Sequence, residues 1–176
     1  MAWLRRIARS RITWALAGVA AVVVAAGAIY LEPWRLFTST TVEEAAPVPA
    51  GPTTPGVPAA RTLSTGTLIS HEHGTSGAVE IIQLSDGGRV LRLADLDTSD
   101  GPDLHVWLSD APVLPGRDGW GVFDDGAYVD LGSLKGNKGS QNYEIPAGAD
   151  LSALRSVTVW CARFHVSFGA AELVAR

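Results

Sequence analysis

The chain has 176 residues, of which 47% are hydrophobic and 18% charged, and this balance excludes a disordered polyelectrolyte. A single cysteine excludes a disulfide framework and a cysteine-rich zinc module. The net charge is −4 and the folded part has no basic patch, which disfavours nucleic-acid binding. Residues 1–31 carry four arginines and no acid, whereas residues 32–176 carry ten basic and eighteen acidic residues, so the two parts suit different environments.

Residues 1–37 are predicted to be a basic N-terminus followed by a transmembrane signal-anchor. No charge occurs from Ile12 to Leu31, and a helix of that length spans ~30 Å, the thickness of a bilayer core. The arginines precede this run, which predicts a single-pass protein of the cell membrane with a cytoplasmic N-terminus and an extracytoplasmic C-terminal domain. The alternative is a signal peptide cleaved at Ala26-Gly27-Ala28, and both interpretations export the rest of the chain.

Residues 38–61 are predicted to be a disordered linker rich in Pro, Thr and Ala. Five of the ten prolines lie between Thr38 and Ala60, where the only charges are Glu43 and Glu44. The segment has no periodic apolar pattern, so we expect an extended, solvated spacer.

Residues 62–176 are predicted to form one all-β domain, a β-sandwich-like fold or a small barrel. Short apolar or alternating runs between turn signals predict strands near 63–70, 78–84, 89–96, 103–109, 127–131, 140–145, 155–162 and 164–174, the last interrupted at Gly169. A short helical turn is expected at Ala149–Leu154. The stretch from Ala111 to Gly126 is expected to be a long surface loop, and loops of this length are often functional.

Cys161 is the first candidate for chemistry. If its segment is a strand, Cys161 shares a face with Val157 and Val159, and Trp160 points the other way. That apolar face favours a buried thiol acting as a small hydrophobic residue. Two observations favour a reactive thiol: the exported side of a membrane is oxidising, and a cation at Arg163 or His165 would lower the pKa of the thiol.

The histidines and the cysteine suggest a metal site with four candidate ligands: His71, His73, His105 and Cys161. Cysteine followed closely by histidine in an all-β domain is typical of type 1 copper sites, although the usual axial methionine is missing here. For each histidine taken singly, a hydrogen-bonded or surface role is the simpler interpretation.

Two further patterns have structural alternatives. The acidic run from Asp95 to Asp103 contains oxygen ligands for calcium, but its spacing is not that of an EF-hand, and turn formation is the simpler explanation. Trp120, in the long loop, is a candidate to stack on a ligand, whereas core packing is the simpler role for Trp107 and Trp160. Hydrolase and nucleotide-binding motifs are missing, so nothing indicates an enzyme.

Six ordered motifs between about residues 64 and 174 resemble the DM-thirteen family, also called electron-transfer DM domains. The matching stretches are Gly66-Thr67-Leu68, His73-Gly74-Thr75-Ser76-Gly77, Gly101-Pro102-Asp103-Leu104-His105-Val106-Trp107-Leu108, Asp130-Leu131-Gly132-Ser133-Leu134-Lys135-Gly136-Asn137, Gln141-Asn142-Tyr143-Glu144-Ile145-Pro146, and Ser156-Val157-Thr158-Val159-Trp160-Cys161 continuing to Phe164-His165-Val166-Ser167-Phe168-Gly169. The order and spacing of these motifs make the resemblance more specific than any one of them.

The resemblance implies an all-β, extracytoplasmic domain, often tethered to a membrane, whose hallmark is the cysteine of the Trp-Cys pair, here Cys161. The family's cysteine has been proposed to be redox-active because the domain often accompanies DOMON and cytochrome b-type modules. Most members do not place histidine at the position of His165, which argues against copper. This chain has no such module, so a redox partner would be a separate protein.

Two functions from different classes follow. The first is an extracytoplasmic electron-transfer accessory in which Cys161 is the redox thiol or a cofactor ligand, tuned by Arg163 or His165. The cofactor is unknown, and the candidates to hold one are His73, His105 and Trp160. The second is a non-catalytic surface binding or scaffold module with a structural cysteine and a ligand site around Trp120.

Overall fold

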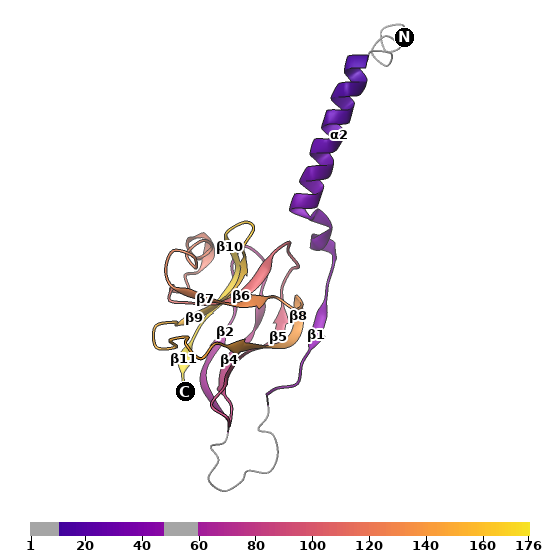
Figure 1. Ribbon diagram of the computed structural model, residues 1–176. Helices are drawn as coiled ribbons and strands as arrows, with labels where there is room; N and C mark the ends of the chain where they lie inside the picture. The colour runs from indigo at the N-terminus through magenta and orange to yellow at the C-terminus, as the bar shows by residue number, and fades with distance from the viewer. Residues whose placement is uncertain (1–10, 48–59) are drawn as a thin grey trace. The chain divides into compact units, whose positions relative to one another are not determined.

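The computed structural model describes residues 11–47 and 60–176, so three of the four N-terminal arginines (Arg5, Arg6 and Arg9) lie outside the described part. The chain divides into two compact units, residues 1–34 and 35–176. The described part of the first unit contains the helix α2 (Arg11–Leu31), after which η1 (Pro33–Phe37), a 3-10 helix, begins (Figure 1). Helix α2 has 21 residues, buries no side chain, and is long and apolar enough to cross a membrane, features that a signal sequence shares.

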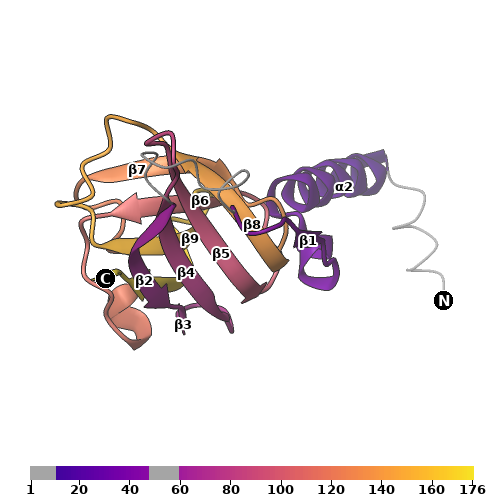
Figure 2. The same cartoon turned by 90° about the horizontal axis from the view of Figure 1, so that it is seen from below.

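The second unit contains two packed β-sheets. The six-stranded sheet has the order β1-β8-β5-β4-β2-β11, with β1 (Thr41–Glu43), β8 (Lys138–Ile145), β5 (Arg89–Asp97), β4 (Ser76–Gln83), β2 (Arg61–Thr67) and β11 (Val174–Ala175). The five-stranded sheet has the order β3-β10-β9-β6-β7, with β3 (Ile69–Ser70), β10 (Val166–Glu172), β9 (Ser156–Cys161), β6 (Leu104–Ser109) and β7 (Tyr128–Ser133) (Figure 2). The predicted all-β sandwich is therefore confirmed.

Two of the predicted strands are each divided between the sheets. The run 63–70 breaks at the buried Leu68, so that β2 joins the six-stranded sheet and β3 the five-stranded one. The run 164–174 breaks at Leu173 rather than at Gly169, where the structure has only a shift in the register between β9 and β10. The expected helical turn at Ala149–Leu154 is a single hydrogen-bonded turn, in which the N–H of Leu154 donates to the Asp150 carbonyl (3.1 Å).

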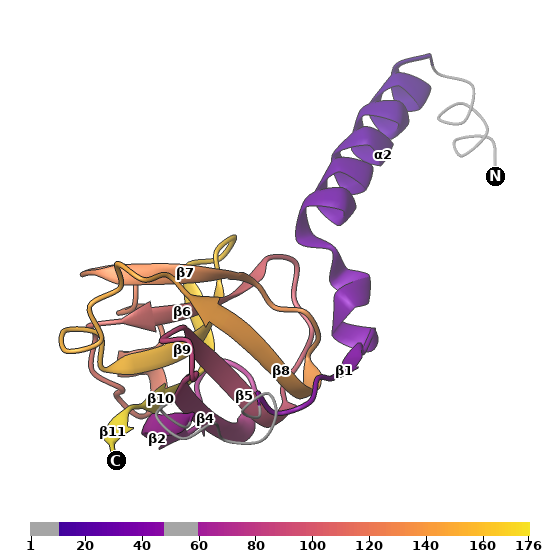
Figure 3. The same cartoon turned by 60° about the horizontal axis from the view of Figure 1, so that its bottom comes forward.

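The start of the expected linker is part of the fold, which corrects the sequence-based expectation of a solvated spacer from Thr38 onward. Strand β1 pairs in parallel with β8, and the N–H of Glu44 donates to the Ser140 carbonyl (2.8 Å) (Figure 3). The Asn137 side chain accepts the N–H of Thr40 (2.7 Å). Strand β1 has no signal in the sequence, because it has only three residues and no apolar periodicity. Its pairing partner is instead the edge of the sheet that the rest of the domain forms.

Two apolar clusters organise the interior. The larger one fills the space between the sheets and includes Val157, Val159 and Cys161 of β9. The smaller one lies on the other face of the five-stranded sheet, where Trp107, Trp160 and Ala170 pack against residues of the 111–126 loop. Strand β9 is consequently buried on both faces, and all six of its residues are buried.

Candidate functional site

Cys161 lies at the end of β9, between strands β6 and β10. Its side chain is fully buried (0% exposed) in the cluster between the sheets, on the face that the alternation of Val157 and Val159 predicts. Its cross-strand neighbour on β6 is Leu104, and directly paired residues have Cβ atoms about 4.5–5.5 Å apart. The apolar half of the sequence interpretation is therefore confirmed: Cys161 packs as a core residue.

The thiol of Cys161 has a raised pKa. The main cause is burial, which disfavours the thiolate, and the negative charge of Asp103 raises the pKa further. Backbone N–H groups of Phe164 and Arg163 act in the opposite direction and only partly compensate. Cys161 is thus a neutral thiol at physiological pH, whereas a cation beside the sulfur would have lowered its pKa.

Arg163 and His165 occupy the turn between β9 and β10 in different ways. Arg163 acts on the sulfur through its backbone N–H. The side chain of His165 is 73% exposed, and its Nδ1 lies 2.8 Å from Asp124 Oδ2. Its ring meets the edge of Trp160 with the centroids 6.5 Å apart, so His165 belongs to the face of β9 opposite Cys161.

The face opposite Cys161 carries a row of aromatic rings. Trp160 is fully buried, and its ring stacks on Trp107 of β6 with the centroids 5.2 Å apart. Trp107 stacks in turn on Tyr128 of β7, at 4.1 Å and an interplanar angle of 8°. Phe123, from the long loop, covers Trp160 edge-on at 6.2 Å. Trp160 and Cys161 are adjacent in the chain, so this pair contributes one side chain to each of the two apolar clusters.

His71 is buried beside this aromatic layer. Its Nδ1 lies 2.8 Å from the hydroxyl of Ser167, which is itself 2.8 Å from the hydroxyl of Thr158. Burial lowers the pKa of His71, partly offset by the nearby carbonyl of Leu114. Its Nε2 has no hydrogen bond of good geometry within the described residues. His71 is a neutral, structural histidine that ties the bend after β3 to β10.

His73 and His105 lie apart from each other and have different partners. The His73 ring packs on Phe168 with the centroids 3.9 Å apart, and its Nε2 pairs with Glu72. His105, on β6, is held between two carboxylates: its Nδ1 is 2.9 Å from Asp130 and its Nε2 is 3.3 Å from Asp103. The sequence predicted neither carboxylate partner, because Asp130 comes from the neighbouring strand β7.

The candidate metal ligands do not meet in one place. Among residues 11–47 and 60–176, no group of three or more His, Cys, Asp or Glu side chains could hold a metal ion. The acidic run, which the sequence offered as a calcium site, has other partners: Asp97 pairs with Lys138, and Asp100 accepts the hydroxyl of Thr38 at 2.7 Å.

The long loop is folded onto the sheet. Its backbone is fixed at Trp120, whose carbonyl accepts the N–H of Ser167 (2.7 Å). The indole of Trp120 is half-buried under the guanidinium of Arg117, 5.4 Å from the ring centroid. Trp120 is therefore a poor platform for stacking on an external ligand.

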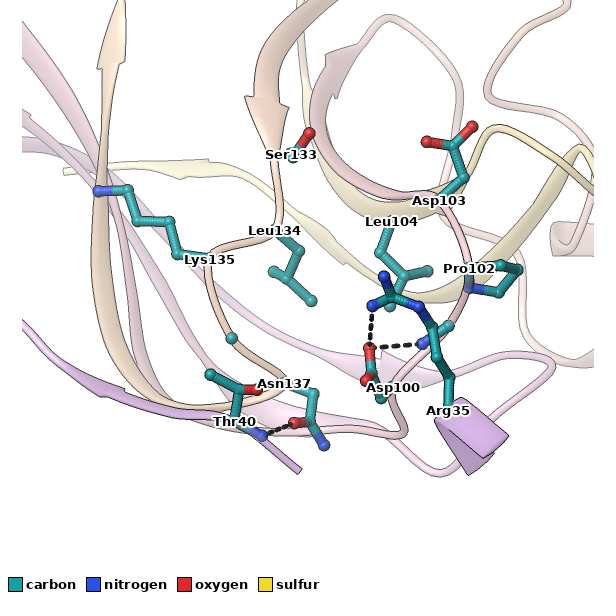
Figure 4. Close-up of a pocket in the computed structure, with 12 residues that line it drawn as sticks. Arg35, Thr40, Asp100, Pro102, Asp103, Leu104, Ser133, Leu134, Lys135 and Asn137 are labelled. Carbon is teal, nitrogen blue, oxygen red and sulfur yellow. Dashed lines mark hydrogen bonds and ion pairs between the residues drawn. The ribbon is translucent and has the colours of Figure 1, made fainter. Parts of the chain in front are cut away.

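A polar cavity of about 210 Å³ opens at the end of the sandwich where Leu104 begins β6 (Figure 4). Its walls come from three segments, namely the residues before β1 (Arg35 and Thr40), the Asp100–Leu104 turn, and the Ser133–Asn137 turn. Arg35 reaches over Asp100 at 3.5 Å. Leu104 stands between this cavity and the strand of Cys161, and sequence reasoning missed the cavity because Arg35 and Thr40 were assigned to an anchor and a spacer.

In a comparison with known protein families, residues 67–173 match the model described as Electron transfer DM13. The chain belongs to this family. Curated proteins and solved structures gave no significant match.

The DM13 match covers Cys161, the aromatic row and two of the three segments that wall the cavity. The third segment, with Arg35, Thr40 and strand β1, precedes the matched range. Strand β1 and this wall of the cavity therefore lie outside the part of the chain that matches DM13. The family description connects the chain to electron transfer, which directs attention to the only thiol in its sequence.

Proposed function

We propose that this chain is a membrane-tethered, extracytoplasmic redox accessory whose redox-active group is the thiol of Cys161. The observation that carries the proposal is the position of that thiol: the only cysteine of an electron-transfer family domain lies fully buried on the central strand β9. Burial also protects a free thiol in an oxidising compartment, where an exposed one would form disulfides.

The surroundings of Cys161 limit which redox reactions its thiol can undergo. A single cysteine gives no disulfide within the chain, and full burial prevents one with another protein in this conformation. A neutral thiol is a poor nucleophile and resists two-electron oxidation by peroxide, because both reactions need the thiolate and access. The described residues offer no group of metal ligands to accompany the sulfur. The reaction that these surroundings leave open to the thiol is the loss of one electron, because an electron can leave a buried group without direct contact with the oxidant.

In the proposed step, the thiol of Cys161 is oxidised and a centre in a partner protein is reduced. The sulfur of Cys161 gives up one electron and the S–H bond breaks, leaving a thiyl radical. The electron reduces a strongly oxidising one-electron centre in a separate redox protein. The proton passes to the carboxylate of Asp103, whose charge already acts on the thiol.

The test is oxidation of the full-length chain in detergent by a photo-generated ruthenium(III) complex, a one-electron oxidant, followed by peptide mass spectrometry. We expect oxidation products at Cys161, and none when hydrogen peroxide replaces the ruthenium complex. Cys161→Ala is the matched control for oxidation elsewhere. If Cys161 stays unmodified under one-electron oxidation while other residues react, the proposed redox role is wrong.

The second candidate is a non-catalytic binding module with a structural cysteine. The observation that favours it is that Cys161 is packed among apolar side chains such as Val157 and Val159. Because Trp120 is half-buried, the polar cavity beside Leu104 replaces the long loop as its ligand site. This function predicts that Cys161→Ala changes stability and leaves every redox measurement unaltered.

A further inference from the structure

The aromatic row on the face opposite Cys161 runs from the surface to the centre of the sheet. Tyr128 is 46% exposed, Trp107 is 6% exposed and Trp160 is fully buried. Successive ring centroids are 4.1 and 5.2 Å apart, and both contacts are stacked. The row ends on the residue before Cys161, and consecutive Cα atoms are about 3.8 Å apart.

The three rings are held by a rigid framework. They come from β7, β6 and β9, which are hydrogen-bonded neighbours in one sheet. In the registers, Trp107 pairs with Asp130 of β7 and with Thr158 of β9, so strand pairing on both sides of β6 fixes the position of the central ring. Rings held in contact by a packed sheet keep their separations constant, and electron transfer between groups falls steeply with separation.

The three side chains, one phenol and two indoles, are chemically suited to one-electron oxidation. Phenol and indole are the amino-acid rings that lose one electron most readily. An oxidised indole becomes acidic and is trapped when its N–H proton leaves. The Nε1 atoms of Trp107 and Trp160 are buried and have no hydrogen-bond acceptor within the described residues, so an oxidised ring here would keep its proton and could be reduced again.

We propose that Tyr128, Trp107 and Trp160 form a path for single electrons between the protein surface and the strand of Cys161. This inference rests on the proposed function and specifies its route. A one-electron oxidant docked at Tyr128 is reduced by one electron drawn through Trp107 from Trp160, which becomes an indole cation radical. The thiol of Cys161 then returns one electron to Trp160 and loses its proton to Asp103, as in the step above.

The surface around Tyr128 identifies the chemistry of the partner. Three carboxylates lie within four residues of Tyr128 in the sequence, at Asp124, Asp125 and Asp130, and Asp110 lies against Gly126. A redox protein that docks here would present a positively charged face, and its association would weaken as salt is added.

The path is tested in the full-length chain with a cationic ruthenium photo-oxidant attached to an Ala127→Cys variant. Ala127 is exposed and adjacent to Tyr128, whereas the buried Cys161 stays unlabelled. The measured quantity is the rate at which the indole radical appears after a laser flash. We expect Trp107→Phe, which keeps an aromatic ring but is much harder to oxidise, to slow this rate at least tenfold.

Trp120→Phe is the matched control, because it makes the same change from indole to phenyl at a half-buried tryptophan that lies outside the row. Equal rates in the wild type and Trp107→Phe, or an equal loss in Trp120→Phe, would overturn the path. Circular dichroism and thermal unfolding of each variant establish that it is folded before its rate is compared.

A second measurement, the lifetime of the Trp160 radical, tests the electron path and the proposed role of Cys161 independently of each other. If the thiol returns the electron, the Trp160 radical should live longer in Cys161→Ala. An unchanged lifetime combined with a Trp107-dependent rate would refute the role of Cys161 and retain the path. Oxidation of Cys161 that does not depend on Trp107 would refute the path and retain the thiol.

Discussion

Cys161 shows at the scale of one residue how surroundings select chemistry. The same sequence, Trp-Cys followed by Arg163 and His165, was consistent with an activated thiolate or with a packed thiol. The fold places the side chain between the sheets, burial raises its pKa, and the charge of Asp103 adds to that effect. The sequence alone does not give this result, because the charge of Asp103 acts on the thiol from a different connection between strands.

The raised pKa of Cys161 predicts a specific alkaline weakness. A thiol whose pKa is higher in the folded state stabilises the fold below the unfolded pKa of ~8.5, and this contribution is lost as pH rises toward the folded pKa. The free energy of unfolding of the wild type should therefore fall, relative to Cys161→Ala, by up to ~1.4 kcal/mol per pH unit above pH ~8.5. Urea titrations of both proteins between pH 7 and 10 measure it.

The ionisation of Tyr143 sets the upper pH limit for this comparison of the two proteins. Burial raises its pKa to about 12, so its own alkaline effect begins only above the ordinary value of ~10 and is common to both proteins. A constant difference between the wild type and Cys161→Ala from pH 8.5 to 10 would show that the thiol ionises as easily in the folded state as in the unfolded one.

At the scale of elements, the central strands and the edge strand differ in how far the sequence predicted them. Apolar runs such as Val157–Val159 and the turn at Ser85–Gly88 marked strands β9, β4 and β5 within a few residues. Strand β1 carried no such pattern, because its pairing depends on β8 and on side chains such as Asn137. Local periodicity reports burial, and β1 is mostly exposed.

The attachment of β1 leads to a prediction at Gly139. Its φ is +90°, and a Cβ there would lie 2.2 Å from the carbonyl oxygen of Val42, so Gly139→Ala both strains the backbone and pushes β1 away. Gly132, with φ +113° and open space around the Cβ position, isolates the strain alone. Both variants should lose about 1–3 kcal/mol of stability. Only Gly139→Ala should also accelerate hydrogen exchange at the Glu44 amide.

The contrast between the two glycines makes this test decisive. Equal exchange at Glu44 in Gly139→Ala and Gly132→Ala would show that β1 is not held against β8 in solution. Amide exchange followed by mass spectrometry or NMR resolves the two cases.

At the scale of the whole molecule, composition predicted the division of the chain better than it predicted the site. The uncharged run from Ile12 corresponds to helix α2, and the all-β domain that follows matches the DM13 family over residues 67–173. The buried, apolar face on which Cys161 lies was predicted correctly, whereas the aromatic row and the cavity depend on contacts between distant strands.

The N-terminal helix allows one prediction for the intact protein. If α2 is a signal-anchor, protein purified from membranes retains the residues before and within the helix, and peptide mass spectrometry detects them. Alkaline carbonate should not extract it, because a span of ~20 apolar residues is held by the bilayer core. A mature protein that begins after Ala28 and washes off the membrane would identify a cleaved signal peptide instead.

The most direct test of the central claim is the rate at which iodoacetamide alkylates Cys161 in the folded, full-length chain as a function of pH. A buried, neutral thiol predicts modification that waits for unfolding and shows no rise near neutral pH. Fast modification of the folded protein with an apparent pKa below ~8.5 would reveal an accessible thiolate and would contradict the one-electron mechanism proposed here.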